Sequence, residues 1–344
     1  MLAKKVWIMV DIVYVETEIA THPISLEVLQ RYKNATVVEI EKYSEVFNPV
    51  NQNFRVQKRN PAMILARKGG EKIMAAPEEY EIGGDQNFYF SHMLNCVYDC
   101  RYCFLQGMYR SANYLLFVNY EEFADDLRSH VVTNDAENPW YFSGYDCDSL
   151  ALDPMTGFAG YFLSVFAEPE MAKATLELRT KSTQIRSLER HAKQYGVAEN
   201  VVIAFSLNPD DVIQAVEALT PSLDKRLTAI TKLQQQGWKV GLRFDPVVWH
   251  DGFEESYRHF FKKVFSQVNA EQLDSITLGA VRLPKTFYKT MLKQMPDEWL
   301  FKAGIQINSN NMAAYQSSIE MNILEFCKQE IECFYSKSVH LYRS

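Results

Sequence analysis

The sequence predicts an α/β protein built mainly as a partial (β/α)6 barrel of the TIM type, with a small N-terminal α/β region before it. Two observations support this prediction. From residue 86 onward, short apolar or β-branched runs alternate with amphipathic stretches of roughly ten to fifteen residues, a pattern typical of βαβ units and parallel sheets. Six such units can be traced, whereas a closed barrel needs eight, so we expect the barrel to be open.

The N-terminal region has strand-like runs at residues 6–15, 35–40 and 62–66, and a polar helical stretch near 25–33. A linker containing proline and glycine follows at 75–85. The six barrel strands are expected at residues 87–92, 140–145, 175–180, 201–206, 239–244 and 275–281. We therefore divide the chain into an N-terminal α/β region (1–85) with a possible nucleic-acid contact, a partial barrel (86–300) and a C-terminal helical extension (301–344).

Two of the connecting helices have recognisable ends. Asn119 followed by Glu122 resembles a capping box and predicts a helix that begins there. Thr220 and Pro221 open a second helix, and Gly237 closes it.

The composition narrows the class of protein. Its 344 residues are 47% hydrophobic and 23% charged, which is typical of a globular chain with a sizeable core and excludes a disordered tail or a fibrous repeat. No apolar run approaches about 18 residues, so we expect no membrane span. A net charge of −7 argues against general electrostatic binding to nucleic acid, although it leaves room for a local basic patch.

One such patch is possible between residues 51 and 70, a segment without any acidic residue. It is either a solvated basic face or an edge that contacts phosphates. Its basic residues are Arg55, Lys58, Arg59, Arg67 and Lys68.

Three of the six cysteines, Cys96, Cys100 and Cys103, fall within eight residues. Six cysteines are too few for a disulfide scaffold, so we expect a cytoplasmic protein with one metal site. Thiolates are soft ligands that suit iron–sulfur clusters, and a set of three leaves one iron open for chemistry. A structural zinc site usually has a fourth ligand, and a ferredoxin-type carrier supplies its fourth cysteine nearby; the pattern therefore favours an open cluster.

Polar residues follow the ends of the later predicted strands. Active sites of βα barrels lie at the carboxyl ends of their strands, so we expect these residues to share one rim. They are Cys147 and Asp148, Lys181, Ser206 and Asn208, Asp245, and Arg282.

The CxxxCxxC spacing after the first barrel strand resembles the radical S-adenosylmethionine superfamily. Further segments are similar to the spore photoproduct lyase family, and together they cover most of the chain. These segments are residues 13–16, 55–68, 103–106, 117–119, 176–181, 205–208 and 237–241. The resemblance implies a lyase with a 4Fe-4S cluster on Cys96, Cys100 and Cys103. It further implies that bound S-adenosyl-L-methionine yields a 5′-deoxyadenosyl radical, which starts the reversal of a thymine-dimer lesion in DNA.

Carried over residue by residue, the resemblance places Asp148, Ser149, Lys181, Ser206 and Asn208 near S-adenosylmethionine. A carboxylate or amide can bond the ribose hydroxyls or the methionyl amine, and the Lys181 ammonium can pair with the methionyl carboxylate. DNA is the implied substrate, and a reducing partner such as flavodoxin or ferredoxin is implied as well. The sequence does not fix the oligomeric state.

The chain departs from the family at two places. The lyases carry a tyrosine on each side of the third cysteine, where this chain has Tyr102 and Phe104. They also carry a hydrogen-donating cysteine after the second strand. Tyr145 falls at that place without a gap, and Cys147 reaches it if the loop is shorter. The candidate catalytic residues are therefore Cys147, Tyr102 and Tyr145.

Two alternatives stay open. The two departures allow a radical S-adenosylmethionine enzyme that acts on another nucleobase, a peptide or a small molecule. Independently of them, the chain could be a nucleic-acid-binding module stabilised by zinc or a cluster, without catalytic activity.

Overall fold

A curved sheet forms the centre of the computed structural model, which describes residues 9–77 and 82–343. Within these residues the sheet has eight strands in the order β4-β5-β9-β10-β11-β13-β14-β18. The neighbours from β5 to β18 are parallel, and β4 is antiparallel to β5. Their bounds are β4 (Met74–Ala75), β5 (Asn87–Phe90), β9 (Trp140–Ser143), β10 (Thr175–Thr180), β11 (Val201–Ser206), β13 (Lys239–Val247), β14 (Leu273–Ala280) and β18 (Val339–Tyr342).

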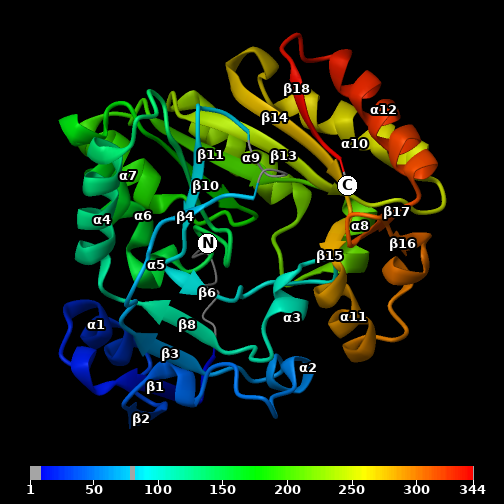
Figure 1. Cartoon of the computed structure of the whole chain (residues 1–344). Helices are drawn as coiled ribbons and strands as arrows, with labels where there is room; N and C mark the ends of the chain where they lie inside the picture. Colours follow the sequence, from blue (N-terminus) through cyan, green and yellow to red (C-terminus); the bar gives the residue numbers. More distant parts are fainter. Residues whose placement is uncertain (1–8, 78–81, 344) are drawn as a thin grey trace.

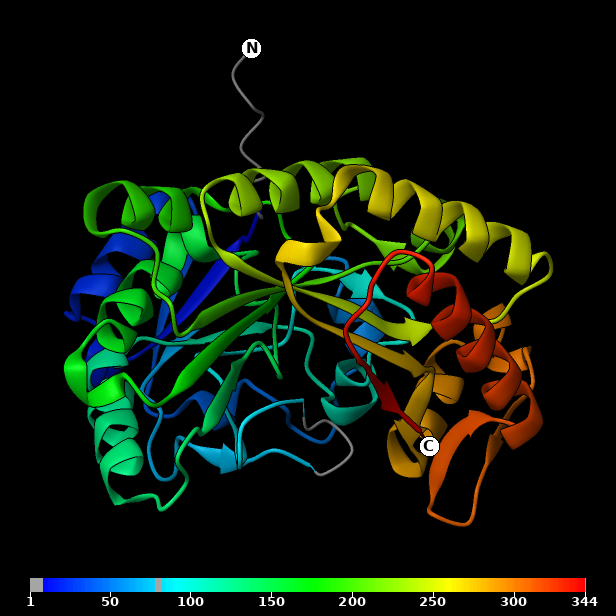
Figure 2. The same cartoon turned by 90° about the horizontal axis from the view of Figure 1, so that it is seen from above.

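The sheet curls into an open half-barrel with helices along its outer side (Figures 1 and 2). The predicted fold class and all six predicted barrel strands are confirmed. β18 was not predicted: it comes from the C-terminal segment expected to be helical, and it adds a further parallel strand beside β14. It has only four residues, too few to give a clear periodicity.

The outer helices bury apolar stripes against the sheet. α10 shows the pattern, because Phe253, Tyr257, Phe260, Phe261 and Val264 are buried while the rest of the helix is mainly polar. None of the helices in the described part of the chain combines the length and apolar content that crossing a membrane requires. The helices around the half-barrel are α4 (Tyr120–Thr133), α5 (Asp153–Thr156), α6 (Phe158–Phe166), α7 (Arg186–Tyr195), α8 (Asp210–Val216), α9 (Leu223–Gln235), α10 (Phe253–Gln267) and α12 (Ser317–Glu332).

The predicted helix ends agree in part. α9 lies between Pro221 and Gly237, and Gly237 has the positive φ of +88° that favours glycine after a helix. α4 begins just after Asn119, but the Asn119 side chain does not cap it. Its amide instead accepts from the Lys68 backbone N–H at 2.9 Å and donates to the Lys68 carbonyl at 3.1 Å.

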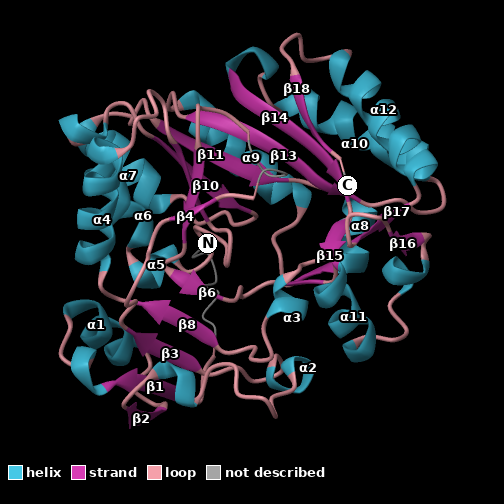
Figure 3. Ribbon diagram, in the orientation of Figure 1, coloured by secondary structure: helices cyan, strands magenta, loops and turns pink. Residues whose placement is uncertain are grey.

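A second sheet lies beside the half-barrel, in the order β2-β1-β3-β8-β6 (Figure 3). The central strand β3 is buried on both faces, with Ile64 in the main core and Met63 and Leu65 in a smaller one. The elements of this region are β1 (Ile12–Glu16), α1 (Pro23–Arg31), β2 (Thr36–Ile40), α2 (Phe54–Gln57), β3 (Met63–Ala66), β6 (Met93–Leu94) and β8 (Tyr114–Phe117).

This second sheet combines segments from both sides of residue 85. β1, β2 and β3 precede it, whereas β6 and β8 flank the cysteine motif, so the motif starts next to the N-terminal sheet. The division into three domains stays a prediction. Residues 6–8 of the first predicted strand and residues 78–81 of the predicted linker lie outside the described residues.

A short helix after the motif, α3 (Leu105–Met108), packs against α11 (Lys285–Gln294) near a small sheet of β15 (Arg282–Pro284), β17 (Met312–Tyr315) and β16 (Ile305–Ile307). Gly107 permits this close approach, because an added Cβ would lie 2.4 Å from the Phe287 carbonyl oxygen. The glycine therefore fixes how closely the end of the cysteine segment approaches α11.

We expect Gly107→Ala to lower the free energy of unfolding by about 1–3 kcal/mol, because the extra carbon meets backbone that cannot rotate away. Gly160→Ala in α6 is the matched control. An added Cβ there meets nothing within 4 Å, so alanine should raise the stability by up to about 1 kcal/mol. Urea unfolding of both variants measures the two effects, and equal stabilities would contradict the packing argument.

Candidate active site

The cysteine segment is attached to the barrel by a short antiparallel pair. β7 (Asp99–Cys100) pairs with β12 (Glu217–Ala218), which directly follows α8. The Arg101 N–H also donates to the Val216 carbonyl at 2.8 Å. This attachment carries the three cysteines over the carboxyl ends of the barrel strands.

One cavity at this end of the half-barrel collects most of the predicted site residues. It is lined by the cysteine segment, by the carboxyl-terminal ends of β9, β10, β11, β13 and β14, and by residues that follow β9, β10 and β14. Ser149 and Asn208 do not line the cavity, although Ser149 lies in the loop after β9 and Asn208 in the loop after β11. The predicted residues that line it are Cys96, Cys100, Tyr102, Cys103, Tyr145, Cys147, Asp148, Lys181, Ser206, Asp245 and Arg282.

The three thiols of the motif face a poorly solvated environment. Burial raises the pKa of Cys96 to about 12 and also raises the pKa of Cys100 and Cys103. Two lysines lie near the motif, Lys58 from the N-terminal region and Lys181 from the loop after β10. The positive charge of each lowers the pKa of Cys103. Soft metal ions displace thiol protons, so these thiols would bind metal as thiolates flanked by cations.

These features fit an iron–sulfur cluster. The three thiols line a single cavity, and the flanking ammonium groups match the negative charge that a thiolate-bound cluster carries. In residues 9–77 and 82–343, no three His, Cys, Asp or Glu side chains converge closely enough to hold one metal ion. The cysteines of a cubane bind separate irons, so they need not converge on one point.

The carboxylate of Asp148 is occupied by its own chain. Oδ1 accepts from the backbone N–H groups of Leu150 and Ala151 at 3.0 and 2.9 Å, and from Thr180 Oγ1 at 2.7 Å. Oδ2 accepts from the Lys181 N–H at 2.6 Å. Burial raises its pKa and these hydrogen bonds oppose the shift. Asp148 therefore joins the loop after β9 to the loop after β10, and so places Lys181.

Ser149 also serves the loop after β9. Its Oγ lies 3.1 Å from Ser143 Oγ, and its backbone N–H donates to the Arg179 carbonyl at 3.1 Å. The loop is tight because Gly144 has φ +90°, and a Cβ there would lie 2.5 Å from Ser149 Oγ. Ser149 thus shapes the loop that carries Tyr145 and Cys147.

A buried network holds Tyr102, which lies between the last two cysteines. Its hydroxyl donates to Glu217, and Glu217 also accepts from Arg226 at 2.5 Å and from Asn208 Nδ2 at 3.0 Å. Tyr257 donates to the Asn208 Oδ1 at 3.2 Å. Asn208 is thus committed to this network. Neither Glu217 nor Arg226 was predicted as a site residue from the sequence.

The charge of Glu217 persists in this network although the side chain is fully buried. Burial by itself raises the pKa of a carboxyl group, but the Arg226 and Lys181 charges lower the pKa of Glu217 to about 2. Lys181 has its ammonium 5.5 Å from the centre of the Tyr102 ring. The ammonium therefore faces the cavity next to the cysteine segment.

Cys147 is buried at the edge of the cavity. Its Sγ lies 3.9 Å from Nδ1 of His92, whose ring stacks on Phe158 with centroids 3.6 Å apart. Burial lowers the pKa of His92 to about 3, so this imidazole is neutral at pH 7. Burial also raises the pKa of Cys147, which keeps a hydrogen on its sulfur.

Tyr145 lies in an aromatic group at the same cavity. Its ring stacks on Tyr89 with centroids 4.4 Å apart and lies 5.3 Å from the ring of Phe104. The phenol of Tyr145 is therefore near the position where the family resemblance predicts a tyrosine and this chain has Phe104.

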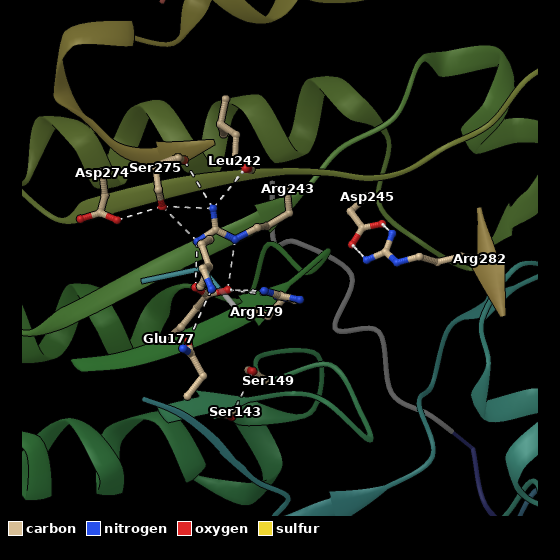
Figure 4. A network of polar contacts seen from close by, with 12 residues as sticks. Ser143, Ser149, Glu177, Arg179, Leu242, Arg243, Asp245, Asp274, Ser275 and Arg282 are labelled. Atoms are coloured by element: carbon tan, nitrogen blue, oxygen red, sulfur yellow. Dashed lines mark hydrogen bonds and ion pairs between the residues drawn. The ribbon is translucent and has the colours of Figure 1, made fainter. Parts of the chain in front are cut away.

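Charged residues line the inner wall of the half-barrel (Figure 4). Glu177 accepts from Arg179 at 2.9 and 3.0 Å and from Arg243 at 2.8 and 3.1 Å. Nearer β15, Arg282 forms a two-pronged ion pair with Asp245 at 3.0 and 3.2 Å. Glu177, Arg179 and Arg243 were not predicted, although Glu177 and Arg179 alternate with leucines in the predicted strand, a pattern typical of two-sided strands.

The basic segment at residues 51–70 is largely engaged within the molecule. Arg55 binds Asp99 at 2.6 and 2.9 Å, and Lys58 donates to the Cys96 carbonyl at 2.5 Å. Arg67 binds Glu122 at 2.7 and 2.8 Å, and the ammonium of Lys68 lies 5.5 Å from the centre of the Phe117 ring. Arg59 is exposed, and its side chain has no hydrogen bond or ion pair among the described residues. From the sequence, this segment was expected to be either a solvated face or an edge that contacts phosphates. The structure shows a third role, because Arg55 and Lys58 support the cysteine segment.

Comparisons with known proteins agree with the geometry. A family model described as spore photoproduct lyase matches residues 8–309. The spore photoproduct lyase of Bacillus subtilis (strain 168) is 26% identical over 311 residues, covering 86% of this chain and 87% of that protein. The enzyme of that name from Clostridium acetobutylicum is 21% identical over 342 residues, covering 95% and 96%. The resemblance predicted from the cysteine motif is thereby confirmed.

Solved structures share the fold. A spore photoproduct lyase mutant with bound AdoMet and dinucleoside spore photoproduct superposes with a TM-score of 0.80 at 18% identity, covering 97% of this chain and 98% of that one. A spore photoproduct lyase complexed with dinucleoside spore photoproduct gives a TM-score of 0.79 at 17% identity with the same coverage.

We expect Glu217→Gln to lower the free energy of unfolding by about 3–5 kcal/mol at pH 7, because it leaves the buried Arg226 guanidinium without its counter-charge. Glu189→Gln is the control; it removes a partly exposed ion pair with Lys232 and should cost at most about 1 kcal/mol. Urea unfolding measures both.

The same effect has a pH dependence. The depressed pKa of Glu217 stabilises the wild type above the unfolded pKa of 4.5, and this contribution is lost as the pH falls toward about 2. The stability difference between wild type and Glu217→Gln should therefore shrink between pH 5 and pH 2. A constant difference over that range would contradict the role assigned to the charge.

Proposed function

The chain belongs to the spore photoproduct lyase family, and on that premise we propose that it is a radical S-adenosylmethionine lyase that reverses spore photoproduct, a thymine-dimer lesion in DNA. The observation that carries this proposal is the single cavity at the strand ends, where three clustered thiols, a fourth separate thiol and three tyrosines meet. Two solved structures with the same fold contain dinucleoside spore photoproduct, and one of them also contains AdoMet.

The cofactors of this reaction are a 4Fe-4S cluster and S-adenosyl-L-methionine. Cys96, Cys100 and Cys103 would hold the cluster, and we assign Lys181 and Ser206, which line the same cavity, to S-adenosylmethionine. When bound, the two cofactors supply a 5′-deoxyadenosyl radical that abstracts hydrogen from the lesion. Asp148, Ser149 and Asn208 act by positioning, because their polar atoms bond neighbouring loops.

Lys181 is suited to orient an anionic group. Its backbone is fixed by Asp148, while its ammonium forms no hydrogen bond or ion pair with another described side chain and faces the Tyr102 ring. An ammonium held in this way can pair with the methionyl carboxylate of S-adenosylmethionine in a poorly solvated cavity.

Cys147 is the proposed hydrogen donor. Its pKa is raised and His92 beside it is neutral, so the sulfur keeps its hydrogen at pH 7. In the donation step the S–H bond breaks, a C–H bond forms on the product radical, and the unpaired electron remains on the Cys147 sulfur. Of the three tyrosines that line the cavity, we propose Tyr102 or Tyr145 as the phenol that returns a hydrogen atom to that sulfur.

The partners follow from this chemistry. The lesion must leave the base stack to enter the cavity, at an unpairing cost of a few kcal/mol that is lower at a damaged site. We propose a low-potential electron-transfer protein such as flavodoxin or ferredoxin as the reducing partner. All six cysteines are free thiols, which suits the reducing cytoplasm.

The function is tested by reconstituting the full chain anaerobically with iron and sulfide. S-adenosylmethionine, dithionite and an oligonucleotide carrying spore photoproduct are then added, and thymine and 5′-deoxyadenosine are followed by mass spectrometry. We expect restored thymine, and none with Cys100→Ala, which should lose the cluster. 5′-Deoxyadenosine without thymine, at equal rates with lesion and undamaged DNA, would overturn the substrate and favour another radical S-adenosylmethionine reaction.

We expect Cys147→Ala to keep cluster content and S-adenosylmethionine cleavage within about twofold of wild type but to yield little clean thymine, because the product radical lacks its hydrogen donor. Cys333→Ala removes an exposed thiol on the same chain and should behave as wild type. Product analysis by mass spectrometry distinguishes the two. Wild-type yields of thymine from Cys147→Ala would move the donor role to Tyr145 or Tyr102.

A further inference from the structure

Lys58 lies directly beside the first cysteine of the motif. It follows α2 in the N-terminal region, and its Nζ donates to the Cys96 carbonyl oxygen at 2.5 Å. The ammonium also lies 5.2 Å from the centre of the buried Tyr114 ring. The side chain is half-buried, so the charge points inward toward the cysteine segment and is partly shielded from water.

No carboxylate neutralises this ammonium. Among the described residues, Lys58 has no ion pair, and its hydrogen bond goes to an uncharged carbonyl. The carboxylate between the cysteines, Asp99, is already shared by two other cations. Arg55 binds it at 2.6 and 2.9 Å, and Arg101 lies 3.4 Å from its Oδ2.

A poorly solvated charge without a counter-charge is costly, so its retention needs a compensating partner. The residue that it contacts is the first motif cysteine, because its Nζ donates to the Cys96 carbonyl oxygen at 2.5 Å. A cluster bound to three thiolates carries negative charge, and one-electron reduction makes that charge larger. A fixed cation beside it therefore favours the reduced form.

We infer that Lys58 is a positioning residue of the cluster site, which holds the Cys96 backbone in place and raises the reduction potential of the cluster. This inference rests on the proposed function, because it needs a cluster on the three cysteines. It also assigns a role to the N-terminal basic segment that is distinct from phosphate contact. The redox step is one-electron: the cluster gains an electron from an external low-potential donor, and no bond forms or breaks.

The test compares three substitutions in the reconstituted full chain. Lys58→Met removes charge and hydrogen bond, Lys58→Gln removes the charge but keeps a donor for the Cys96 carbonyl, and Lys58→Arg keeps the charge. Arg59→Met is the matched control, since Arg59 is the next residue, is exposed and has no side-chain partner among those described. Iron and sulfide analysis comes first, followed by redox titration with dithionite monitored by electron paramagnetic resonance.

We expect Lys58→Met and Lys58→Gln to be at least tenfold harder to reduce than wild type. For a one-electron couple this corresponds to a midpoint potential about 59 mV more negative. Lys58→Arg and Arg59→Met should reduce at the wild-type potential. If Lys58→Met assembles no cluster, Lys58→Gln still measures the effect of charge.

The outcomes separate the inference from the proposed function. Wild-type protein that binds no iron and sulfide would overturn the function itself. A wild-type cluster whose potential is unchanged in Lys58→Gln would overturn only the role of Lys58. If all three Lys58 variants lose the cluster while circular dichroism shows an intact fold, the role of Lys58 in the potential would also be overturned. Cluster binding would then depend on the shape of the lysine side chain and not on its charge.

Discussion

The site depends on a buried ion pair between Glu217 and Arg226. Glu217 lies in β12, whose pairing with β7 brings Cys100 over the barrel strands, and its carboxylate also accepts from Tyr102 and Asn208. Arg226 reaches back from α9 to the Ser206 carbonyl at 3.0 Å. One carboxylate thus links the cysteine segment, the end of β11 and an outer helix. Because a buried charge without its partner is costly, the three parts keep their positions together.

The polar residues of the cavity fall into two groups. Asp148, Ser149 and Asn208 have their hydrogen-bonding capacity taken up by neighbouring loops, so they determine shape. Lys181 and Cys147 have few partners of their own, and they face the space that a ligand would occupy. A side chain whose hydrogen-bonding groups are already paired cannot orient a substrate without breaking one of those hydrogen bonds. We therefore assign the chemical roles to Lys181 and Cys147, and the preorganisation of the cavity to Asp148, Ser149 and Asn208.

The sequence was sufficient for the six barrel strands and the cysteine motif, since both are local patterns: apolar runs of strand length and a fixed spacing of thiols. It was not sufficient for Glu217 or Lys58, whose roles depend on pairing between segments far apart in the chain. A basic residue shows its charge in the sequence but not the direction of its side chain. Glu177 and Arg179 are intermediate, because their alternation with leucines already indicates a polar inner face.

The local arrangement of charge also explains why the net charge of −7 is a poor guide to what this cavity can bind. Three carboxylates near the cavity are each outnumbered by cations: Glu177 by Arg179 and Arg243, Glu217 by Arg226 and Lys181, and Asp99 by Arg55 and Arg101. Asp245, which lines the cavity, is paired with Arg282. Asp148, at the same rim, turns its oxygens to backbone N–H groups and Thr180. Fields in a cavity with poorly solvated walls come from the nearest charges, whereas acidic residues on the distant surface are screened by water and salt. An acidic protein can therefore hold a site that favours anionic groups, such as a thiolate-bound cluster, a carboxylate or a phosphate.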